Sequence, residues 1–428
     1  MRDRIFPREL IGSLLAVLII VSGVGQSTIV PPASAQALHS GEGGVPTFQL
    51  DPSWPKVPAK WKVGSVSSSS VDAQDHVWII HRPRSLPEDQ RGIAAPPVLE
   101  FDNAGNFIQG WGGEAPGYEW PLNEHGIHVD HKGYVWLLGS HRRDGQILKF
   151  TKTGKFVMQI GRRDQTGGSN TEHLNEPAGL RVYPKTNELF VADGYANRRV
   201  IVFDADTGKY KRHWGAYGNR PVDIGPRAGD GSAHIRFHPD DPWRAYAENL
   251  QQLDNPHDVA VSNDGLVYVA DRGNKRVQVF TVDGKYIKQQ FVGVDNVKYL
   301  QKSPGCPLPP CHTPDIQARG VAFSPDLQQN FLYVAGLPDI FILNRRTMEI
   351  LGSFETGEVQ EHPPNHHIAV DGFGNIYTTQ TGLAGGGKQG TAQIQRFLFK
   401  GLSPVITRTT GGERQAPQLW EGRCPVRC

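Results

Sequence analysis

The chain has 428 residues, of which 49 are glycine and 32 are proline, and its 45 Lys and Arg nearly balance its 43 Asp and Glu. A net charge of +2 gives no surface-wide field that would favour nucleic acid or an anionic membrane surface as a partner. Beyond residue 45 the sequence shows many short apolar runs that end in Gly, Asp or Asn, which is typical of an all-β fold with frequent turns.

The first 35 residues predict a secretory signal peptide. Three arginines in the first eight residues precede the apolar stretch 10–24, and the small residues 33–35 suit cleavage after Ala35. The apolar run is shorter than the ~20 residues that a membrane span needs, so an uncleaved anchor is the less favoured alternative. We therefore expect a secreted or periplasmic protein that is monomeric and free of the membrane after cleavage.

Two segments in the middle of the chain are copies of one unit. Residues 188–215 and 266–291 each contain an apolar strand, an Asp-containing turn, a strand with Arg-Val alternation, a glycine turn and a last strand. A further strand precedes each segment, so the repeated unit consists of four antiparallel strands.

Weaker copies extend the repeat on both sides. They cover residues 64–112, 122–162, 317–355 and 364–400. Six such units predict a six-bladed β-propeller over residues 64–400, with 36–63 as a lead-in segment and 401–428 as a C-terminal tail. A tandem of β-sandwiches is less favoured, because no linker separates the units.

The repeat also resembles a known family. Its pattern, P-x-x-(V/I)-A-V…G-x-(V/I)-Y-V-A-D…N-x-R-(V/I)-x-V-F…G, is similar to the NHL repeat over residues 64–400. This resemblance predicts the fold more strongly than the function, because such propellers serve many purposes.

Three histidines share one position in the repeat. His125, His257 and His366 each lie eight residues before the glycine of the following turn, in blades two, four and six. The aligned positions of blades one, three and five are Ser67, Ala178 and Arg319. Because alternate blades of a six-bladed ring stand about 120° apart, three imidazoles at one depth can converge on one point of the channel.

Such a trio predicts a metal site. Three histidines with an open fourth position are the arrangement of a catalytic zinc site. Imidazole also suits copper, nickel and iron, which stay open as alternatives.

Chain direction predicts what surrounds this site. In each blade the second strand ends on the face where the first begins, so Arg82 and Tyr195 are expected beside the metal. The long segment 215–255 reaches the same face and is expected to form a partial cover.

These residues together resemble peptidyl-α-hydroxyglycine α-amidating lyase. Its histidine motifs are similar to "EHGI", "PHDV" and "NHHI" here, and its D-G-Y-x-N-x-R motif matches residues 193–199. Its F-H-R-G-D turn is similar to residues 80–84. The resemblance implies a zinc held by three histidines, with Tyr195 as general base and Arg82 holding a carboxylate or carbonyl group.

The implied activity is a metal-dependent carbon–nitrogen lyase. It would cleave a carbinolamide, releasing glyoxylate and an amide, so the expected partner is a small-molecule or peptide substrate with a C-terminal hydroxyglycine-like group. A metal could bind the substrate hydroxyl and favour its loss of a proton.

The resemblance also implies a structural calcium, for which this sequence is less suited. The family places an aspartate directly after its third histidine, and that position is His367 here. Ser69 and Ile127 could still offer the two backbone carbonyls. His367 is also an alternative to His366 as the third zinc ligand.

Two other functions stay open from the sequence. One is a non-catalytic propeller that binds a cell-envelope or peptide ligand. The other is a lactonase-like hydrolase, although such enzymes hold calcium through Glu, Asn and Asp rather than histidine.

Four cysteines fit an oxidising compartment. Cys306 and Cys311 flank "PLPP", and Cys424 and Cys428 flank "PVR", which suggests a local disulfide within each couple. Four cysteines nevertheless allow three connectivities. The stretch "CPLPPCH" (306–312) also resembles a widely spaced haem attachment, but a closed Pro-rich loop is favoured.

Overall fold

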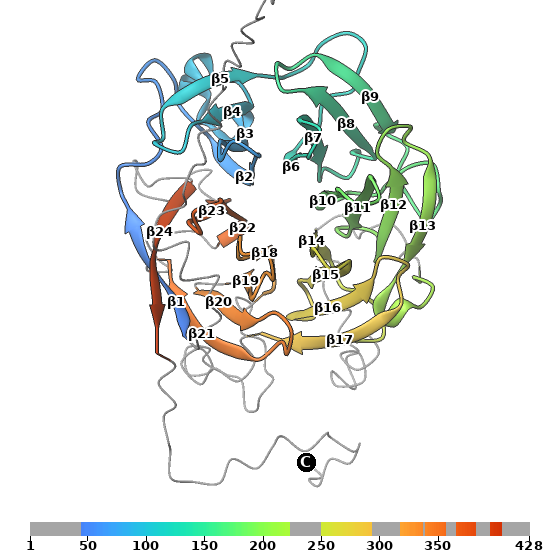
Figure 1. The fold of residues 1–428 in the computed structure, drawn as a ribbon. Helices are drawn as coiled ribbons and strands as arrows, with labels where there is room; N and C mark the ends of the chain where they lie inside the picture. The colour runs from blue at the N-terminus through green and yellow to red at the C-terminus, as the bar shows by residue number, and fades with distance from the viewer. Residues whose placement is uncertain are drawn as a thin grey trace, which may run out of the picture. The chain divides into compact units, whose positions relative to one another are not determined.

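The computed structural model describes residues 44–222, 250–292, 317–336, 339–356, 365–381 and 394–404, all within the compact unit Pro32–Cys428. The signal segment, the four cysteines, most of the tail and the middle of the 215–255 segment lie outside these residues. The described chain forms six four-stranded antiparallel sheets with only short helical turns, as the sequence predicts (Figure 1).

Five of the sheets are built in chain order. The first two are β2(Ser65–Val71), β3(Val77–Arg82), β4(Val98–Phe101), β5(Phe107–Trp111), and β6(Glu124–Val129), β7(Tyr134–Gly139), β8(Gln146–Thr151), β9(Phe156–Gly161). The next two are β10(Gly179–Tyr183), β11(Glu188–Asp193), β12(Arg199–Asp204), β13(Tyr210–Trp214), and β14(Pro256–Val261), β15(Leu266–Asp271), β16(Arg276–Thr281), β17(Tyr286–Phe291). The fifth is β18(Gly320–Phe323), β19(Phe331–Ala335), β20(Asp339–Asn344), β21(Ile350–Glu355).

The sixth sheet joins the two ends of the described chain. It consists of β22(Asn365–Val370), β23(Ile376–Gln380), β24(Ile394–Ser403) and β1(Val45–Asp51). β1 runs antiparallel to β24, with Val45 opposite Ser403 and Asp51 opposite Arg396. The propeller therefore begins earlier than the expected residue 64 and ends later than residue 400, because the lead-in segment supplies the outer strand of blade six.

The first strand of each sheet lies next to the first strand of the neighbouring sheets, all around the ring (Figure 1). The first strands therefore line the centre, and the fourth strands form the rim. The second and third strands are almost wholly buried, whereas the rim strands are half exposed. Strands buried on both faces need continuous apolar runs, which explains sequences such as "YVWLLG" in β7.

The hydrophobic core is divided into layers between neighbouring sheets. One layer, for example, packs Trp136 of β7 against Leu180 of β10 and Phe203 of β12. Each blade thus buries its faces against its two neighbours, which is the reason that a single blade cannot fold alone.

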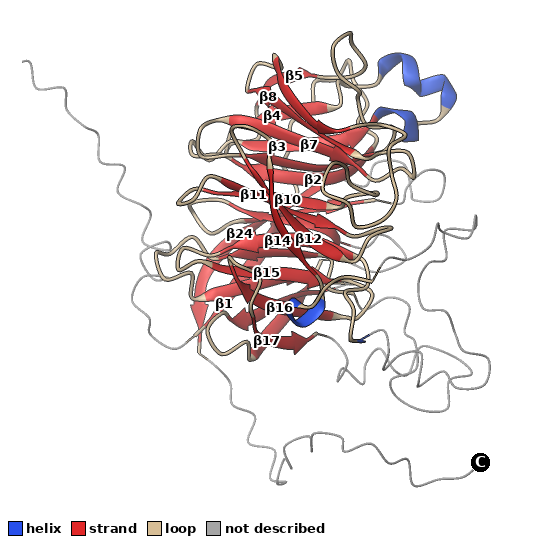
Figure 2. Cartoon of the chain, turned by 90° about the vertical axis from the view of Figure 1, so that its right-hand side faces the viewer, coloured by secondary structure: helices blue, strands red, loops and turns tan. Residues whose placement is uncertain are grey.

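Short 3-10 helices lie outside the sheets. They are η1(Pro83–Ser85), η2(Glu88–Ile93) and η3(Ala216–Gly218). In the edge-on view the helical turns drawn in blue project beyond the strands on one face (Figure 2). Among the described residues, none of the helical segments has the length and apolar character required to cross a membrane.

Candidate metal centre

The structure brings His125, His257 and His366 together at the centre of the ring. One ligand nitrogen of each lies within 4.8 Å of those of the other two. The ring centroids are 5.1 Å apart for His125 and His257, and 4.7 Å apart for each pair that includes His366. All three side chains are buried, so the trio has the compactness that a shared ion requires.

A local irregularity in the first strand of each even blade aims these side chains. The pairing of β6 with β7 shifts between Glu124 and Gly126, so that His125 is an extra residue in its strand. The same shift occurs in β14 and β22, at His257 and His366, and also at Ser67 in β2 of the odd blade one. A β-bulge turns one side chain out of the regular alternation. In this protein it turns each histidine toward the axis.

The odd blades fix the orientation of these rings through their backbone. His125 Nδ1 lies 2.7 Å from the carbonyl oxygen of Ala178, His257 Nδ1 2.7 Å from that of Arg319, and His366 Nδ1 2.7 Å from that of Ser67. A carbonyl oxygen only accepts, so each Nδ1 carries the hydrogen and each Nε2 presents a lone pair. Hydrogen bonds of this kind orient and polarise metal-ligating histidines.

The three imidazoles are neutral at ordinary pH. Burial, as the largest cause, holds the pKa of His125, His257 and His366 well below the usual value of 6.5, and neighbouring positive side chains lower it further. Because a metal must displace any proton from its ligand, neutral imidazoles are ready to bind one.

The arrangement fits a metal ion chemically. The Nε2 atoms of His125 and His257 both contact the Tyr195 hydroxyl, at 2.9 and 3.0 Å. A single hydroxyl has one hydrogen and can donate to only one of these lone pairs. A cation would satisfy the converging nitrogens together, and neutral histidine nitrogens of this kind bind Zn²⁺, Cu²⁺, Fe²⁺ or Ni²⁺.

A rigid turn holds Tyr195 at this position. The buried Asp193 carboxylate accepts hydrogen bonds from Asn197 Nδ2 and from the fully buried Arg199 Nε, both at 2.8 Å. Gly194 approaches Pro256 so closely that a Cβ would lie 1.8 Å from its carbonyl oxygen. Asp193, Asn197 and Arg199 of the motif D-G-Y-A-N-R-R thus close the turn that presents the tyrosine.

Arg82 reaches the site from the end of β3. Its Nε donates to the carbonyl oxygen of Glu124 at 2.8 Å, so the side chain crosses from blade one to blade two, next to His125. Arg84 donates to the Glu124 carboxylate at 3.0 Å and strengthens the same connection. A cavity of about 320 Å³ opens beside Arg82 and Glu124.

Arg272 is a site residue that the sequence patterns above leave unassigned. Its Nη1 donates to the Tyr195 hydroxyl at 3.2 Å, and its guanidinium lies 5.9 Å from the centroid of the tyrosine ring. Arg272 directly follows β15, the second strand of blade four, just as Arg82 ends the second strand of blade one. The rule of chain direction that selects Arg82 would therefore have selected Arg272.

His367 lies apart from the trio and contacts an acidic residue. Its Nε2 is 3.4 Å from the buried Asp258 carboxylate. Of the two adjacent histidines, the structure thus places His366 and not His367 next to His125 and His257. Ser69 and Ile127 lie on the first strands of blades one and two. With His367 in place of an aspartate, this donor set fits calcium poorly, because calcium prefers oxygen ligands.

A second group of metal-binding residue types has a structural explanation. Asp72, His76 and Glu100 lie close together in blade one. The Asp72 carboxylate accepts hydrogen bonds from the His76 backbone, the Trp78 indole and Lys152 Nζ, which close the turn between β2 and β3. Asp130 and Asp371 close the corresponding turns of blades two and six. The Asp72 position is therefore part of the repeat, and the side chain of His76 contacts Glu100 at 2.8 Å.

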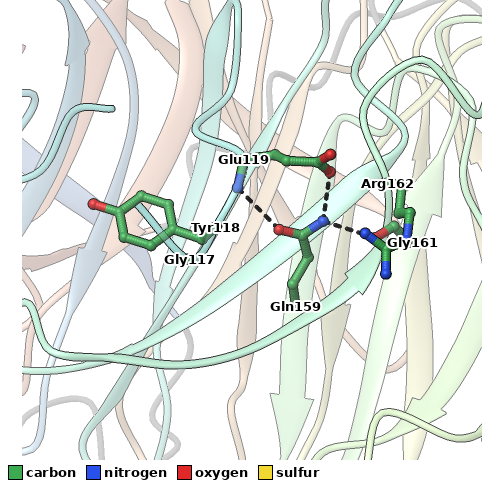
Figure 3. Close-up of a pocket in the computed structure, with 6 residues that line it drawn as sticks. All are labelled: Gly117, Tyr118, Glu119, Gln159, Gly161 and Arg162. Carbon is green, nitrogen blue, oxygen red and sulfur yellow. Dashed lines mark hydrogen bonds between the residues drawn. The ribbon is translucent and has the colours of Figure 1, made fainter. Parts of the chain in front are cut away.

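A pocket of about 380 Å³ lies on the rim of blade two (Figure 3). Its lining residues are Gly117, Tyr118, Glu119, Gln159, Gly161 and Arg162. Gln159 and Glu119 are hydrogen-bonded to each other through both backbone and side chain, at 3.0 and 2.6 Å. Since the pocket lies on the outer strand β9 and the histidines on first strands, it is separate from the central site.

Comparison with known proteins relates the chain to amidating enzymes. The NHL repeat family profile matches residues 253–280, which include His257. Peptidyl-glycine alpha-amidating monooxygenase A of Xenopus laevis is 27% identical over 348 residues, which cover 77% of this chain and 32% of that protein. The probable peptidyl-alpha-hydroxyglycine alpha-amidating lyase pgal-1 of Caenorhabditis elegans is 32% identical over 162 residues, covering 37% of this chain and 36% of that protein.

Another relative is named only for its repeats. NHL repeat-containing protein 3 of Homo sapiens is 27% identical over 265 residues, covering 60% of this chain and 62% of that protein. The chain spans about a third of the length of the Xenopus monooxygenase and of the worm lyase. It is an NHL-repeat propeller that resembles the amidating lyases and has amidating enzymes among its distant relatives.

Proposed function

We propose that this protein is a secreted or periplasmic zinc-dependent lyase that cleaves a carbinolamide-type carbon–nitrogen bond. The observation that carries the proposal is the histidine trio with its Nδ1 atoms tied to carbonyls and its Nε2 side against Tyr195. His125, His257 and His366 would hold the metal. A zinc ion bound there would supply Lewis acidity toward the substrate hydroxyl.

Tyr195 is the proposed general base. Its hydroxyl oxygen lies at the metal-binding edge of two of the three rings, within reach of a hydroxyl bound at the centre. The hydroxyl proton passes to the Tyr195 oxygen, the carbon–oxygen bond becomes a carbonyl, and the carbon–nitrogen bond breaks. The amide nitrogen takes the electron pair and then the proton from Tyr195. The step is neither oxidative nor hydrolytic, so no co-reactant is needed.

Two arginines flank this base from opposite blades. Arg272 of blade four donates to the Tyr195 oxygen at 3.2 Å, so its positive charge lies beside the proposed base. Arg82 of blade one is proposed to bind the carboxylate next to the carbinol carbon through its planar fork of donors. A metal with one arginine on either side would suit an anionic substrate.

The direct test is glyoxylate release. Purified protein is incubated with N-benzoyl-α-hydroxyglycine, glyoxylate is quantified, and the zinc content is measured by elemental analysis. We expect about one zinc per chain and a turnover that a chelator abolishes and added zinc restores. Zinc-free protein that shows no affinity for zinc and no turnover would overturn the proposal.

The alternative of a non-catalytic propeller has its own support. The human relative that is named only for its NHL repeats matches a larger share of this chain than the worm lyase does. The same experiment separates the two functions, because a binding propeller would release no glyoxylate at any zinc content. A lactonase-like hydrolase would instead require calcium for turnover of a lactone.

A further inference from the structure

A pair of arginines shares one acceptor on the side of the site that faces away from Arg82. Arg272 Nε donates to Gln317 Oε1 at 2.6 Å, and Arg319 Nε donates to the same oxygen at 2.9 Å. The two guanidinium groups therefore lie side by side on a neutral amide. Like charges held this close repel each other, and an anion between them would relieve that repulsion.

Both arginines are connected to the proposed metal centre. Arg272 contacts the Tyr195 hydroxyl at 3.2 Å, and the backbone carbonyl of Arg319 accepts the hydrogen bond from His257 Nδ1 at 2.7 Å. Arg319 is buried, and its side chain begins at a position where blades one and three carry the small residues Ser67 and Ala178. Within the described ranges, no carboxylate forms an ion pair with Arg272.

The order of the blades shows where this arginine pair lies relative to Arg82. Arg82 belongs to blade one and Arg272 to blade four, which face each other across the ring, and Arg319 belongs to the adjacent blade five. A carbinolamide has a carboxylate at one end and an acyl group at the other. If the carboxylate lies at Arg82, the acyl group points toward blades four and five.

We infer that Arg272, Gln317 and Arg319 form a second anion-binding subsite, which selects substrates whose acyl group carries its own acidic group. This inference rests on the proposed lyase function and narrows its substrate class to carbinolamides that are acidic at both ends. Arg319 is the specificity-determining residue of this subsite. Gln317 is a positioning residue that keeps both guanidinium planes in place.

The experiment compares two probes that differ in this acidic group. The substrates are N-benzoyl-α-hydroxyglycine, with a neutral acyl group, and N-succinyl-α-hydroxyglycine, with an acidic one. For the unmodified protein we expect kcat/KM to be at least about tenfold higher for the succinyl substrate. Arg319→Gln should raise KM for the succinyl substrate about tenfold, the loss expected for one charge-assisted contact. The preference for the succinyl substrate, measured as the ratio of the two kcat/KM values, should fall by the same factor.

Controls distinguish a subsite from a structural role. Arg143→Gln removes an exposed arginine outside the site and should leave both substrates unaffected. Arg319→Lys keeps the charge without the planar fork and should restore part of the succinyl preference. Zinc content must stay constant, since the Arg319 backbone supports His257. Equal use of both substrates by the unmodified protein, or equal KM changes in Arg319→Gln, would overturn the subsite.

Failure of the lyase proposal gives a different result. In that case neither substrate releases glyoxylate, and the subsite is tested by calorimetric binding of N-succinylglycine and N-benzoylglycine. Tighter binding of N-succinylglycine that Arg319→Gln weakens about tenfold would support the subsite alone. Equal binding of the two compounds, or none, would overturn it.

Discussion

Blades two, four and six differ from blades one, three and five at one position, and the difference defines the site. At this position the even blades supply side chains, His125, His257 and His366, which point to the axis from bulged strands. The odd blades supply the backbone carbonyls that accept the Nδ1 hydrogens of those histidines. Around the six-bladed ring, blades that carry a histidine thus alternate with blades whose backbone carbonyl orients it. A site with three equivalent histidines can therefore form in a propeller of six blades.

The largest expected effect comes from replacing one of the three histidines in blades two, four and six. His257→Ala should lower zinc content from about one per chain to a small fraction. Turnover should fall at least about 100-fold, since even the loss of an outer-shell partner costs 10–100-fold. Elemental analysis and the glyoxylate assay measure both quantities.

The matched control for this substitution is His131→Ala. His131 lies exposed in the turn after β6 of the same even blade two. It should retain full zinc and activity. If His257→Ala also retained its zinc, the even blades would not be the ligand-bearing set.

The next prediction is a loss of turnover without a loss of zinc, at Tyr195 of blade three, which contacts two of the three histidines. Tyr195→Phe removes the hydroxyl that contacts His125 and His257 but leaves the ring and its turn in place. We expect kcat to fall about 10²–10⁴-fold, the usual contribution of a general base, while zinc content stays unchanged. Single-turnover kinetics at saturating substrate measure this. Unchanged kcat would assign the proton transfer to another group.

A histidine of an odd blade should affect stability rather than chemistry. His81 of blade one is fully buried, accepts from the Gly64 backbone at 3.2 Å and lies 3.0 Å from the carbonyl oxygen of Pro96. Burial lowers its pKa from 6.5 to about 4. The unfolded chain therefore binds a proton at a higher pH than the folded chain does, so the free energy of unfolding falls as pH drops from 6.5 toward 4.

This contribution amounts to roughly 3 kcal/mol at full effect, at 1.36 kcal/mol per pH unit. Urea unfolding at pH 7 and at pH 4.5, in the presence of chelator, measures it in the unmodified protein and in His81→Gln. Between the two pH values, we expect the free energy of unfolding to fall by about 2 kcal/mol less in the variant than in the unmodified protein. Parallel losses would show that His81 does not carry this dependence.

The smallest effect is expected at Ser67 of blade one, whose backbone carbonyl accepts from His366. Ser67→Ala removes a hydroxyl that lies 3.3 Å from the Ile80 carbonyl but keeps the backbone carbonyl that accepts from His366. Zinc content and turnover should be unchanged, and the free energy of unfolding should fall by less than about 1 kcal/mol. A loss of zinc in this variant would mean that the serine side chain, and not the carbonyl, orients the histidine.

The sequence predicts the histidines of the even blades but not the supporting carbonyls of the odd blades. The trio is visible because histidine recurs at one spacing, and Tyr195 and Arg82 follow from the direction of the strands. The supporting carbonyls give no sequence pattern, because Ser67, Ala178 and Arg319 offer the same backbone atom. The spacing of eight residues to the turn glycine favours His366 over His367. The bulge that turns His366 out of the strand alternation leaves no sequence pattern of its own.

The fold shows the same limit at its ends. The six units are predictable because each contains its own turns and apolar runs. The sequence of β1, VPTFQLD, lies outside any complete unit, and its partner β24 lies more than 300 residues away. A pairing over such a distance leaves no periodic trace in the chain.

The pairing of β1 with β24 also sets an order of events during biosynthesis. The strand that leaves the ribosome first can find its partner only when residues 394–403 have emerged. The three histidines proposed to hold the metal come from blades two, four and six, so the last of them, His366, is made only shortly before β24. A chain made only up to residue 365 holds at most two of the three histidines, so the proposed metal would be bound with full affinity only late in synthesis.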